Sequence, residues 1–135
     1  MTNSNEKGKR GERLLAKYLR DLGFDARRTQ QYNGEGLSDV VIEDSGAHIE
    51  VKFGYPITRF DVCTQLFRDA VHQCESDSDG AQWFLFWKPH RYRDWRLTYP
   101  VDLFADAVGD EIITRVIPVT VVGDEHIRAI LELGT

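Results

Sequence analysis

The sequence predicts an α/β fold in which helices flank a central mixed β-sheet, and three observations support this prediction. Apolar residues recur at helical spacing in residues 7–22. Residues 37–52 alternate between apolar and ionisable side chains around a polar turn, as the two strands of a hairpin do. Residues 82–87 are apolar on both faces, which is typical of a central strand covered by helices. At 135 residues, the chain is expected to form one domain over residues 1–135.

The first expected helix ends at Gly23, which acts as a C-terminal cap. On the helical wheel, Glu12 lies within about 20° of Leu19, at the edge of the apolar stripe. A carboxylate in this position is costly unless another group pairs with it. The alternative is an ordinary surface pair, for which Lys9 and Arg13 are the candidates.

The rest of the chain is expected to alternate between short strands and helices. Thr58 and Asp61 form a capping pair that predicts the start of a second helix. A basic loop with aromatic residues follows the central strand, and Pro118 favours an edge position for a late strand. In chain order, we expect a strand at 24–29, a loop at 30–37, a helix from about 58 to 75, strands at 82–87 and 95–99, a short helix at 102–108, a strand within 112–122 and a helix at 124–133.

The composition is that of a globular domain, with 41% hydrophobic residues and no apolar run of about 18 residues that would cross a membrane. The polar start lacks the apolar segment of a secretory signal, so we expect a cytoplasmic protein without a membrane partner. Cys63 and Cys74 lie 11 residues apart on one expected helix, about 16 Å along its axis, which is too far for a disulfide between them. Both are expected to be reduced thiols in the core.

The net charge of −5 disfavours a nucleic-acid partner, but the charges are unevenly distributed. Residues 7–31 hold eight basic side chains and three acidic ones, and residues 88–96 hold four basic side chains and one acidic one. The excess of acidic residues lies in residues 101–135, where seven acids accompany two arginines. The two basic segments therefore permit phosphate contacts, although a charged stretch is usually a solvated face.

The hairpin gathers ionisable side chains on one face. If its loop has an even length, Asp39, Glu50 and Lys52 share that face, whereas a three-residue loop would turn Asp39 away from Glu50. Two carboxylates with a backbone carbonyl between them are hard oxygen ligands that suit Mg²⁺ or Mn²⁺. A lysine beside such an ion could orient the attacking water or offset charge on a phosphate. The alternative is a half-exposed strand pair with cross-strand ion pairs, and the hairpin alone does not decide between the two.

Several short motifs occur in a characteristic order, and together they are more specific than the hairpin. They are Lys7-Gly8-x-x-Gly11-Glu12, Gly23-Phe24, Arg28-Thr29-Gln30-Gln31, Ser38-Asp39, Ile49-Glu50-Val51-Lys52, Gln65 and Trp95-Arg96-Leu97. With its order of helix, three strands, helix and strand, the chain resembles the restriction-endonuclease-like PD-(D/E)xK nuclease core. More narrowly, it is similar to the archaeal and phage type of Holliday junction resolvase. The resemblance covers about residues 7–105, and residues 106–135 are expected to form a strand–helix extension outside it.

The resemblance implies specific roles for individual residues. It assigns Glu12, Asp39, Glu50 and the backbone of Val51 to a Mg²⁺ ion, which Mn²⁺ can replace, and it makes Lys52 catalytic together with the three acids. With the basic segments, it implies DNA contacts from Lys9, Arg10, Arg27, Arg28, Gln30, Gln31, Gln65 and Arg91. The helical wheel, however, points Gln65 away from the apolar face of its helix. Ser38 replaces the proline of the family's name, a change that removes no ligand.

The function implied by the resemblance is that of a metal-dependent DNA endonuclease that cuts branched DNA as a homodimer, because symmetrical incision of a four-way junction needs two sites. The aromatic residues of 82–87, with Tyr92, Trp95 and Tyr99, also predict a dimer, unless the helices of one chain cover them. The alternatives are a nuclease with another substrate preference and a module that binds DNA or a protein without cutting. A further alternative is an interaction protein whose acidic final third contacts a basic partner. No organic cofactor is expected.

Overall fold

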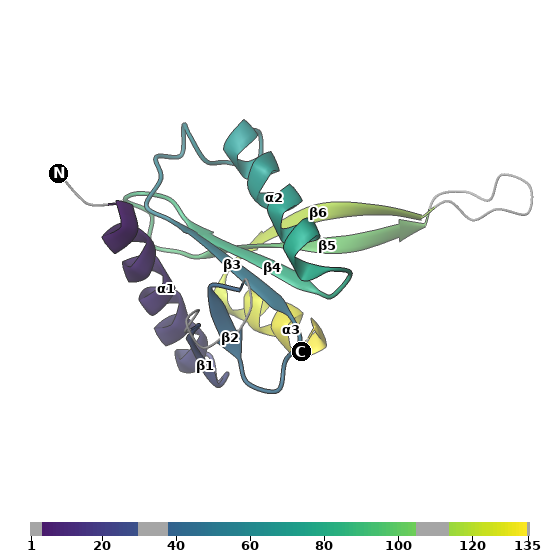
Figure 1. The fold of residues 1–135 in the computed structure, drawn as a ribbon, viewed down its shortest axis with the longest axis horizontal. Coiled ribbons are helices and arrows are strands. Elements are labelled where there is room, and N and C mark those ends of the chain that lie inside the picture. The colour runs from purple at the N-terminus through teal and green to yellow at the C-terminus, as the bar shows by residue number, and fades with distance from the viewer. Residues whose placement is uncertain (1–3, 30–37, 105–113, 135) are drawn as a thin grey trace, which may run out of the picture.

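A computed structural model describes residues 4–29, 38–104 and 114–134 (Figure 1). Within these ranges, the chain forms three helices and six strands. They are α1 (Ser4–Asp21), β1 (Ala26–Arg28), β2 (Val40–Ile42), β3 (His48–Phe53), α2 (Gln65–Ser78), β4 (Trp83–Lys88), β5 (Arg96–Phe104), β6 (Thr114–Val122) and α3 (Asp124–Gly134). The α/β class and the expected order of helix, three strands, helix and strand are confirmed.

Four strands form a mixed sheet in the order β3-β4-β5-β6. β3 and β4 are parallel and are joined through α2, whereas β5 and β6 are antiparallel to their neighbours. The short strands β1 and β2 pair with each other in a separate antiparallel sheet. Figure 1 shows α2 on one face of the larger sheet and α1 and α3 on the other. Because α2 connects two parallel strands, it runs back along β3, and its last turn returns to the start of that strand.

β4 lies inside the sheet, and its alternating side chains serve two separate cores. Trp83, Leu85 and Trp87 pack with α2, whereas Phe84 and Phe86 pack with residues of α1 and α3. All five side chains are at most 4% exposed within a single chain. The predicted central strand is therefore confirmed, and its aromatic side chains offer no uncovered surface for the dimer that the sequence predicts.

The first helix ends close to the predicted position. Gly23 has a φ of 105° and donates from its amide to the Arg20 carbonyl (2.9 Å). The Phe24 amide then reaches the Leu19 carbonyl (3.0 Å). These two hydrogen bonds form the Schellman arrangement that glycine favours at a helix end, so the predicted cap is confirmed.

The second helix begins later than predicted. It starts at Gln65 because the Thr64 hydroxyl accepts a hydrogen bond from the Phe67 amide (3.3 Å) and so caps the helix. The expected start at Thr58 and Asp61 is wrong, since the Asp61 carboxylate accepts from the amide that directly follows it (2.8 Å). A capping pattern in the sequence thus occurs in a turn that precedes the helix.

The two cysteines have different surroundings. Cys63 lies before α2 and is exposed, so the expectation that both thiols are in the core is wrong for this residue. Cys74 is buried, and its burial raises the pKa of the thiol. The helix continues to Ser78, beyond the expected end at Glu75, and Asp79 follows it in the left-handed conformation.

The last third of the chain contains a long strand pair and the expected final helix. β5 includes residues 102–104, so the short helix expected at 102–108 is wrong in its first part, and its remainder lies outside the described residues. β6 is an edge strand in which Pro118 stands opposite Pro100, which confirms the expected edge position. The helix expected at 124–133 is α3. No helix within the described residues is long and apolar enough to cross a membrane.

The predicted hairpin is wrong in its pairing. β2 and β3 follow each other as expected, but β2 pairs with β1, and β3 pairs with β4 along its whole length. The apolar strand β4 offers β3 a buried ladder of six residues, which a three-residue β2 does not match. The Asp39 amide donates to the Ile49 carbonyl (2.8 Å), which holds the start of β2 against the edge of β3. Strand alternation across a hairpin therefore does not determine where the Asp39 side chain lies.

Candidate metal centre

Asp39 lies at the edge of β3 with its carboxylate beside that strand. Its Oδ2 accepts a hydrogen bond from the Val51 amide (2.9 Å), while its own amide donates to the Ile49 carbonyl (2.8 Å). On the other side, the Thr29 amide donates to the Asp39 carbonyl (3.1 Å). The Glu50 carboxylate is close enough to the Asp39 carboxyl group for its charge to raise the Asp39 pKa. The two predicted metal-binding carboxyl groups therefore meet, although the hairpin expected to bring them together does not form.

The Asp39 carboxyl group has a strongly perturbed acidity. Its burial raises the pKa to about 8, the negative charge of Glu50 adds to the rise, and Glu12 contributes less. The hydrogen bond from the Val51 amide acts in the opposite direction. Without a cation, the Asp39 carboxyl group with a pKa of about 8 is mostly protonated near neutral pH. A cation bound between these groups would remove a large electrostatic cost.

Glu12 joins this group of charges from α1. Gly11 makes the close approach possible, because a Cβ on Gly11 would overlap the Phe53 side chain of β3. Glu12 is paired with Arg28 of β1 at 3.0 Å, whereas the surface alternative placed its partner on the same helix. Glu12 makes only a small electrostatic contribution at Asp39, and Arg28 offsets part of its negative charge.

Glu50 and Lys52 line a cleft of about 200 Å³ between β3 and α2. Their side chains point to the same face of the strand because they are two residues apart. Tyr55, together with Asp69 and Gln73 of α2, also lines the cleft. Within the described parts of the chain, Lys52 has no ion-pair partner, so its ammonium group is available to a ligand in the cleft.

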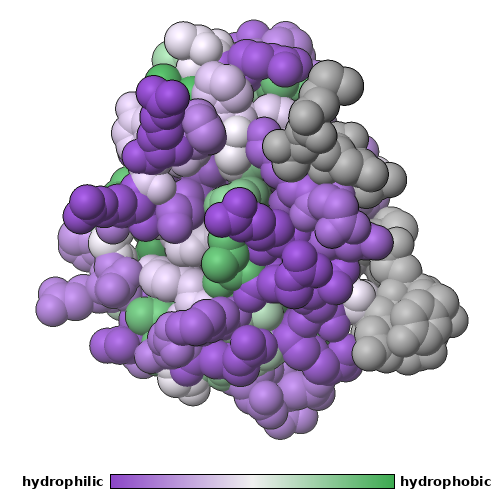
Figure 2. Space-filling model, turned by 90° about the vertical axis from the view of Figure 1, so that its left-hand side faces the viewer, coloured by the Kyte–Doolittle hydropathy of each residue, from purple (hydrophilic) through white to green (hydrophobic). Residues whose placement is uncertain are grey.

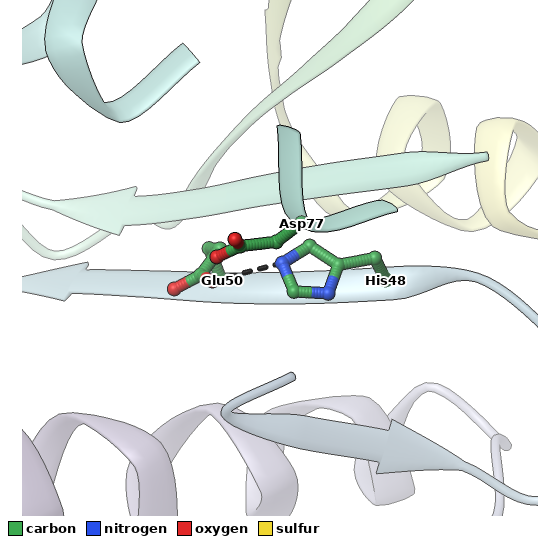
Figure 3. Close-up of side chains that lie close together, drawn as sticks. All are labelled: His48, Glu50 and Asp77. Carbon is green, nitrogen blue, oxygen red and sulfur yellow. Dashed lines mark hydrogen bonds and ion pairs between the residues drawn. The ribbon is translucent and has the colours of Figure 1, made fainter. Parts of the chain in front are cut away.

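A second set of possible ligands adjoins Glu50. The Nε2 atom of His48 lies 2.8 Å from Oε1 of Glu50, on the face of β3 that is covered by α2. Asp77, from the last turn of α2, completes a set whose ligand atoms all lie within 4.8 Å of one another (Figure 3). Neither His48 nor Asp77 is among the metal ligands that the sequence predicts. Strand alternation could have found His48, whereas Asp77 arrives only because α2 runs back to the start of β3.

A larger groove, of about 670 Å³, lies between the start of α1 and the loop from β4 to β5. Its charged lining is basic except for Glu6, and it consists of Lys7, Arg10, Arg13, Lys88 and Arg91. Phe53 and Tyr92 add aromatic surface. The face drawn in Figure 2, which carries the start of α1, is covered mostly by hydrophilic side chains around a small apolar patch. A local excess of positive charge thus exists on a chain whose net charge is −5.

The groove and the cleft adjoin each other. Between them, Lys52 and Tyr55 of the cleft meet Lys88 and Pro89 of the groove around one small pocket. The Lys7 ammonium lies 5.3 Å from the centre of the Tyr55 ring and so spans the same boundary. An extended polyanion that occupied the groove could therefore continue past Lys52 to the carboxyl groups.

The arginines and the lysine expected to contact DNA lie in three places. Arg10 and Arg91 line the groove, and Lys9 is exposed on α1. Arg27 forms an exposed ion pair with an acidic residue near the end of β2. Arg28 is paired with Glu12 of the site. The structure thus brings Arg10 and Arg91 into one surface but separates that surface from Arg27.

The glutamines have no common place. Gln65 is exposed in the first turn of α2 and donates to the Asp69 carboxylate (2.7 Å), in agreement with the helical wheel. Gln30 and Gln31 lie outside the described residues. The Val51 amide donates to the Asp39 carboxylate (2.9 Å). A metal ligand from the Val51 backbone stays a prediction.

The donor set fits a hard divalent cation. Carboxylate oxygens at Asp39 and Glu50, with Glu12 nearby, are ligands that Mg²⁺ and Mn²⁺ accept, and the raised pKa of Asp39 reflects a demand for positive charge. Comparisons with protein-family models, with curated proteins and with solved structures find no match for this chain.

Proposed function

We propose that the protein is a Mg²⁺-dependent DNA endonuclease that hydrolyses phosphodiesters in branched DNA, with Mn²⁺ able to replace Mg²⁺. The proximity of the carboxyl groups of Asp39 and Glu50 carries this proposal. Glu12 adds a smaller electrostatic effect at Asp39, and Lys52 lines the same cleft as Glu50. Burial and repulsion raise the pKa of Asp39 to about 8, and this cost is relieved when a divalent cation replaces the proton. These are the residues to which the PD-(D/E)xK resemblance assigns catalysis.

The proposed division of labour follows from where each side chain lies. Asp39 and Glu50 bind the cation, and Glu12 adds negative charge from α1. A divalent cation in this place polarises the phosphodiester and activates the attacking water. Lys52 directs its ammonium group into the cleft and offsets the charge that develops on the phosphate. Arg28 holds Glu12 in position through their ion pair.

DNA as the substrate is supported by the basic groove that adjoins the cleft. Its five lysines and arginines suit a phosphate backbone that extends beyond the bond to be cut. Branched DNA and a homodimer that assembles on it are proposed from the resemblance to junction resolvases. Because the aromatic side chains of β4 are covered within one chain, such a dimer must use another surface.

An incision assay tests the proposal. Labelled four-way, flap, single-stranded and linear duplex DNA are incubated with the protein in Mg²⁺, Mn²⁺ or EDTA. The wild type should cut the four-way substrate in a metal-dependent manner, whereas Asp39→Asn and Glu50→Gln should not cut. Both variants should retain their circular dichroism and bind DNA in EDTA at least as tightly, because negative charge facing phosphate has been removed. Asp21→Asn, an exposed carboxylate paired with Lys17, is the matched control.

The possible results separate the alternatives. Cleavage that survives in EDTA or in either site variant would contradict the metal centre. Metal-dependent cutting that prefers linear or flap DNA would retain the nuclease and remove the junction preference. Tight binding of DNA without incision in any metal would favour a binding module.

A further inference from the structure

A chain of hydrogen bonds leads to Glu50 from the residue that precedes Asp39. The Ile49 amide donates to Ser38 Oγ (3.3 Å), Ser38 Oγ lies 2.9 Å from His48 Nδ1, and His48 Nε2 lies 2.8 Å from Glu50 Oε1. Since Ser38 Oγ accepts the amide hydrogen, its own hydrogen can be donated to His48 Nδ1. His48 then carries its hydrogen on Nε2 and donates it to the Glu50 carboxylate.

This chain restricts a side chain that would otherwise have several orientations. A glutamate has three rotatable bonds, and fixing them costs conformational entropy at the moment when a ligand binds. His48 is 5% exposed, so the packing around it holds its ring in place. A buried donor at Oε1 therefore sets the orientation of Glu50 in advance and leaves the rest of its carboxylate to Asp39 and to a cation.

The same chain adds a link between the segments that carry the two carboxyl groups. β2 and β3 belong to different sheets, but the Asp39 amide donates to the Ile49 carbonyl and the Val51 amide donates to the Asp39 carboxylate. The bond from Ser38 to His48 joins the residue before Asp39 to the residue two positions before Glu50. The first two bonds place Asp39 beside β3, and the bond through His48 acts on the Glu50 side chain itself.

Building on the function proposed above, we propose that His48, held by Ser38, is a positioning residue that orients Glu50 for cation binding. Hydrogen bonds to metal-binding side chains commonly act in this way, and their loss lowers metal affinity or activity by about 10- to 100-fold. The hydroxyl of Ser38 is essential to this role, and a proline in its place could not supply it. In the competing arrangement, His48, Glu50 and Asp77 bind a metal directly. The engagement of His48 Nε2 by Glu50 favours the positioning role.

The test measures Mn²⁺ binding to the DNA-free protein, with electron paramagnetic resonance reporting the unbound ion. His48→Phe removes the donor and should weaken Mn²⁺ binding by about 10- to 100-fold. His48→Gln can donate from its amide where Nε2 was, and it should stay within about threefold of the wild type. Ser38→Ala should weaken binding by about two- to tenfold, whereas Ser38→Thr, which keeps the hydroxyl, should not.

Each result supports or overturns the positioning role. Wild-type affinity in both His48→Phe and Ser38→Ala would overturn it. So would a His48→Gln variant as weak as His48→Phe, because the imidazole would then be a ligand itself. If His48→Phe fails to fold, Ser38→Ala and Ser38→Thr decide the question. A wild-type protein that binds no Mn²⁺ would refute the proposed function, and this inference with it, whereas wild-type binding that the variants leave unchanged would refute this inference alone.

Discussion

Replacing Asp39 by asparagine should stabilise the metal-free protein at alkaline pH, although Asp39 is proposed to be essential for cleavage. Burial and the charge of Glu50 raise the pKa of Asp39 to about 8 in the folded protein, against an ordinary value of 3.8. Between these two pH values, the folded state binds a proton that the unfolded state does not. The wild type is therefore more stable at the acidic end of this window and loses stability as the pH rises to 8.

The size of the effect follows from the difference in pKa. From 3.8 to about 8 is about four units, and at about 1.4 kcal/mol per unit this sets a ceiling of about 6 kcal/mol. Because unfolding measurements between pH 5 and pH 8.5 sample about three of these four units, we expect a loss on the order of 2–4 kcal/mol in the wild type over this range. Asparagine has no such dependence. Its oxygen can accept from the Val51 amide and its NH₂ group can donate to Glu50, so both contacts are retained.

Urea unfolding in EDTA at pH 5, 7 and 8.5 measures this difference. Wild type and Asp39→Asn should have similar free energies of unfolding at pH 5, and the variant should be the more stable protein at pH 8.5. Asp21→Asn, which changes an exposed carboxylate, should follow the wild type at every pH. Saturating Mg²⁺ should restore the wild type at pH 8.5 and leave Asp39→Asn unchanged. Parallel pH profiles for the wild type and Asp39→Asn in EDTA would refute the coupling between Asp39 and Glu50.

Three further predictions concern the lysine, the groove and the approach of α1. Lys52→Ala should lower kcat by about 10²-fold while changing DNA affinity little, as steady-state kinetics and binding in EDTA will show; a loss of affinity alone would make the lysine a phosphate clamp. Arg10→Ala and Arg91→Ala should each weaken DNA binding and reduce its log–log salt dependence by about one unit per lost phosphate contact, measured by fluorescence anisotropy; an unchanged slope would place DNA elsewhere. Gly11→Ala should cost about 1–3 kcal/mol in urea unfolding and reduce cleavage by displacing α1, whereas Gly8→Ala, whose Cβ meets no neighbour, should do neither.

The elements that the sequence predicted correctly depend on local features. Gly23 can adopt the positive φ that ends α1 wherever the helix packs. Residues 83–87 are apolar at every position, which suits a strand covered on both faces. The start of α2 was missed because both Thr58 and Thr64 are suitable caps in the sequence, and Asp61 lies in the turn between them.

The pairing of β3 could not be predicted in the same way. The strand nearest to β3 in sequence is β2, and pairing between them would form a hairpin. β4, more than thirty residues away, instead offers β3 a longer and buried ladder. The candidate site survives this change because the Asp39 carboxylate bonds to the Val51 amide directly. Residue type, spacing and the family resemblance proposed Asp39 and Glu50 as metal ligands, and this assignment stays a prediction. They could not select Asp77, whose position beside Glu50 depends on the return of α2 along β3.

The oligomeric state connects the proposed chemistry with the fold. The five side chains from Trp83 to Trp87 are buried within one chain, so β4 offers no aromatic face for self-association, whereas Tyr92 of the predicted aromatic set is exposed. One chain supplies one set of carboxyl groups, whereas symmetrical incision of a junction needs two sets. We therefore expect a monomer near 15.5 kDa at micromolar concentration and two chains on each four-way junction, measured by sedimentation velocity in EDTA. A single chain per junction at saturation would contradict paired incision but would leave the proposed metal centre intact. A dimer in the absence of DNA would show that the chains associate through a surface other than β4.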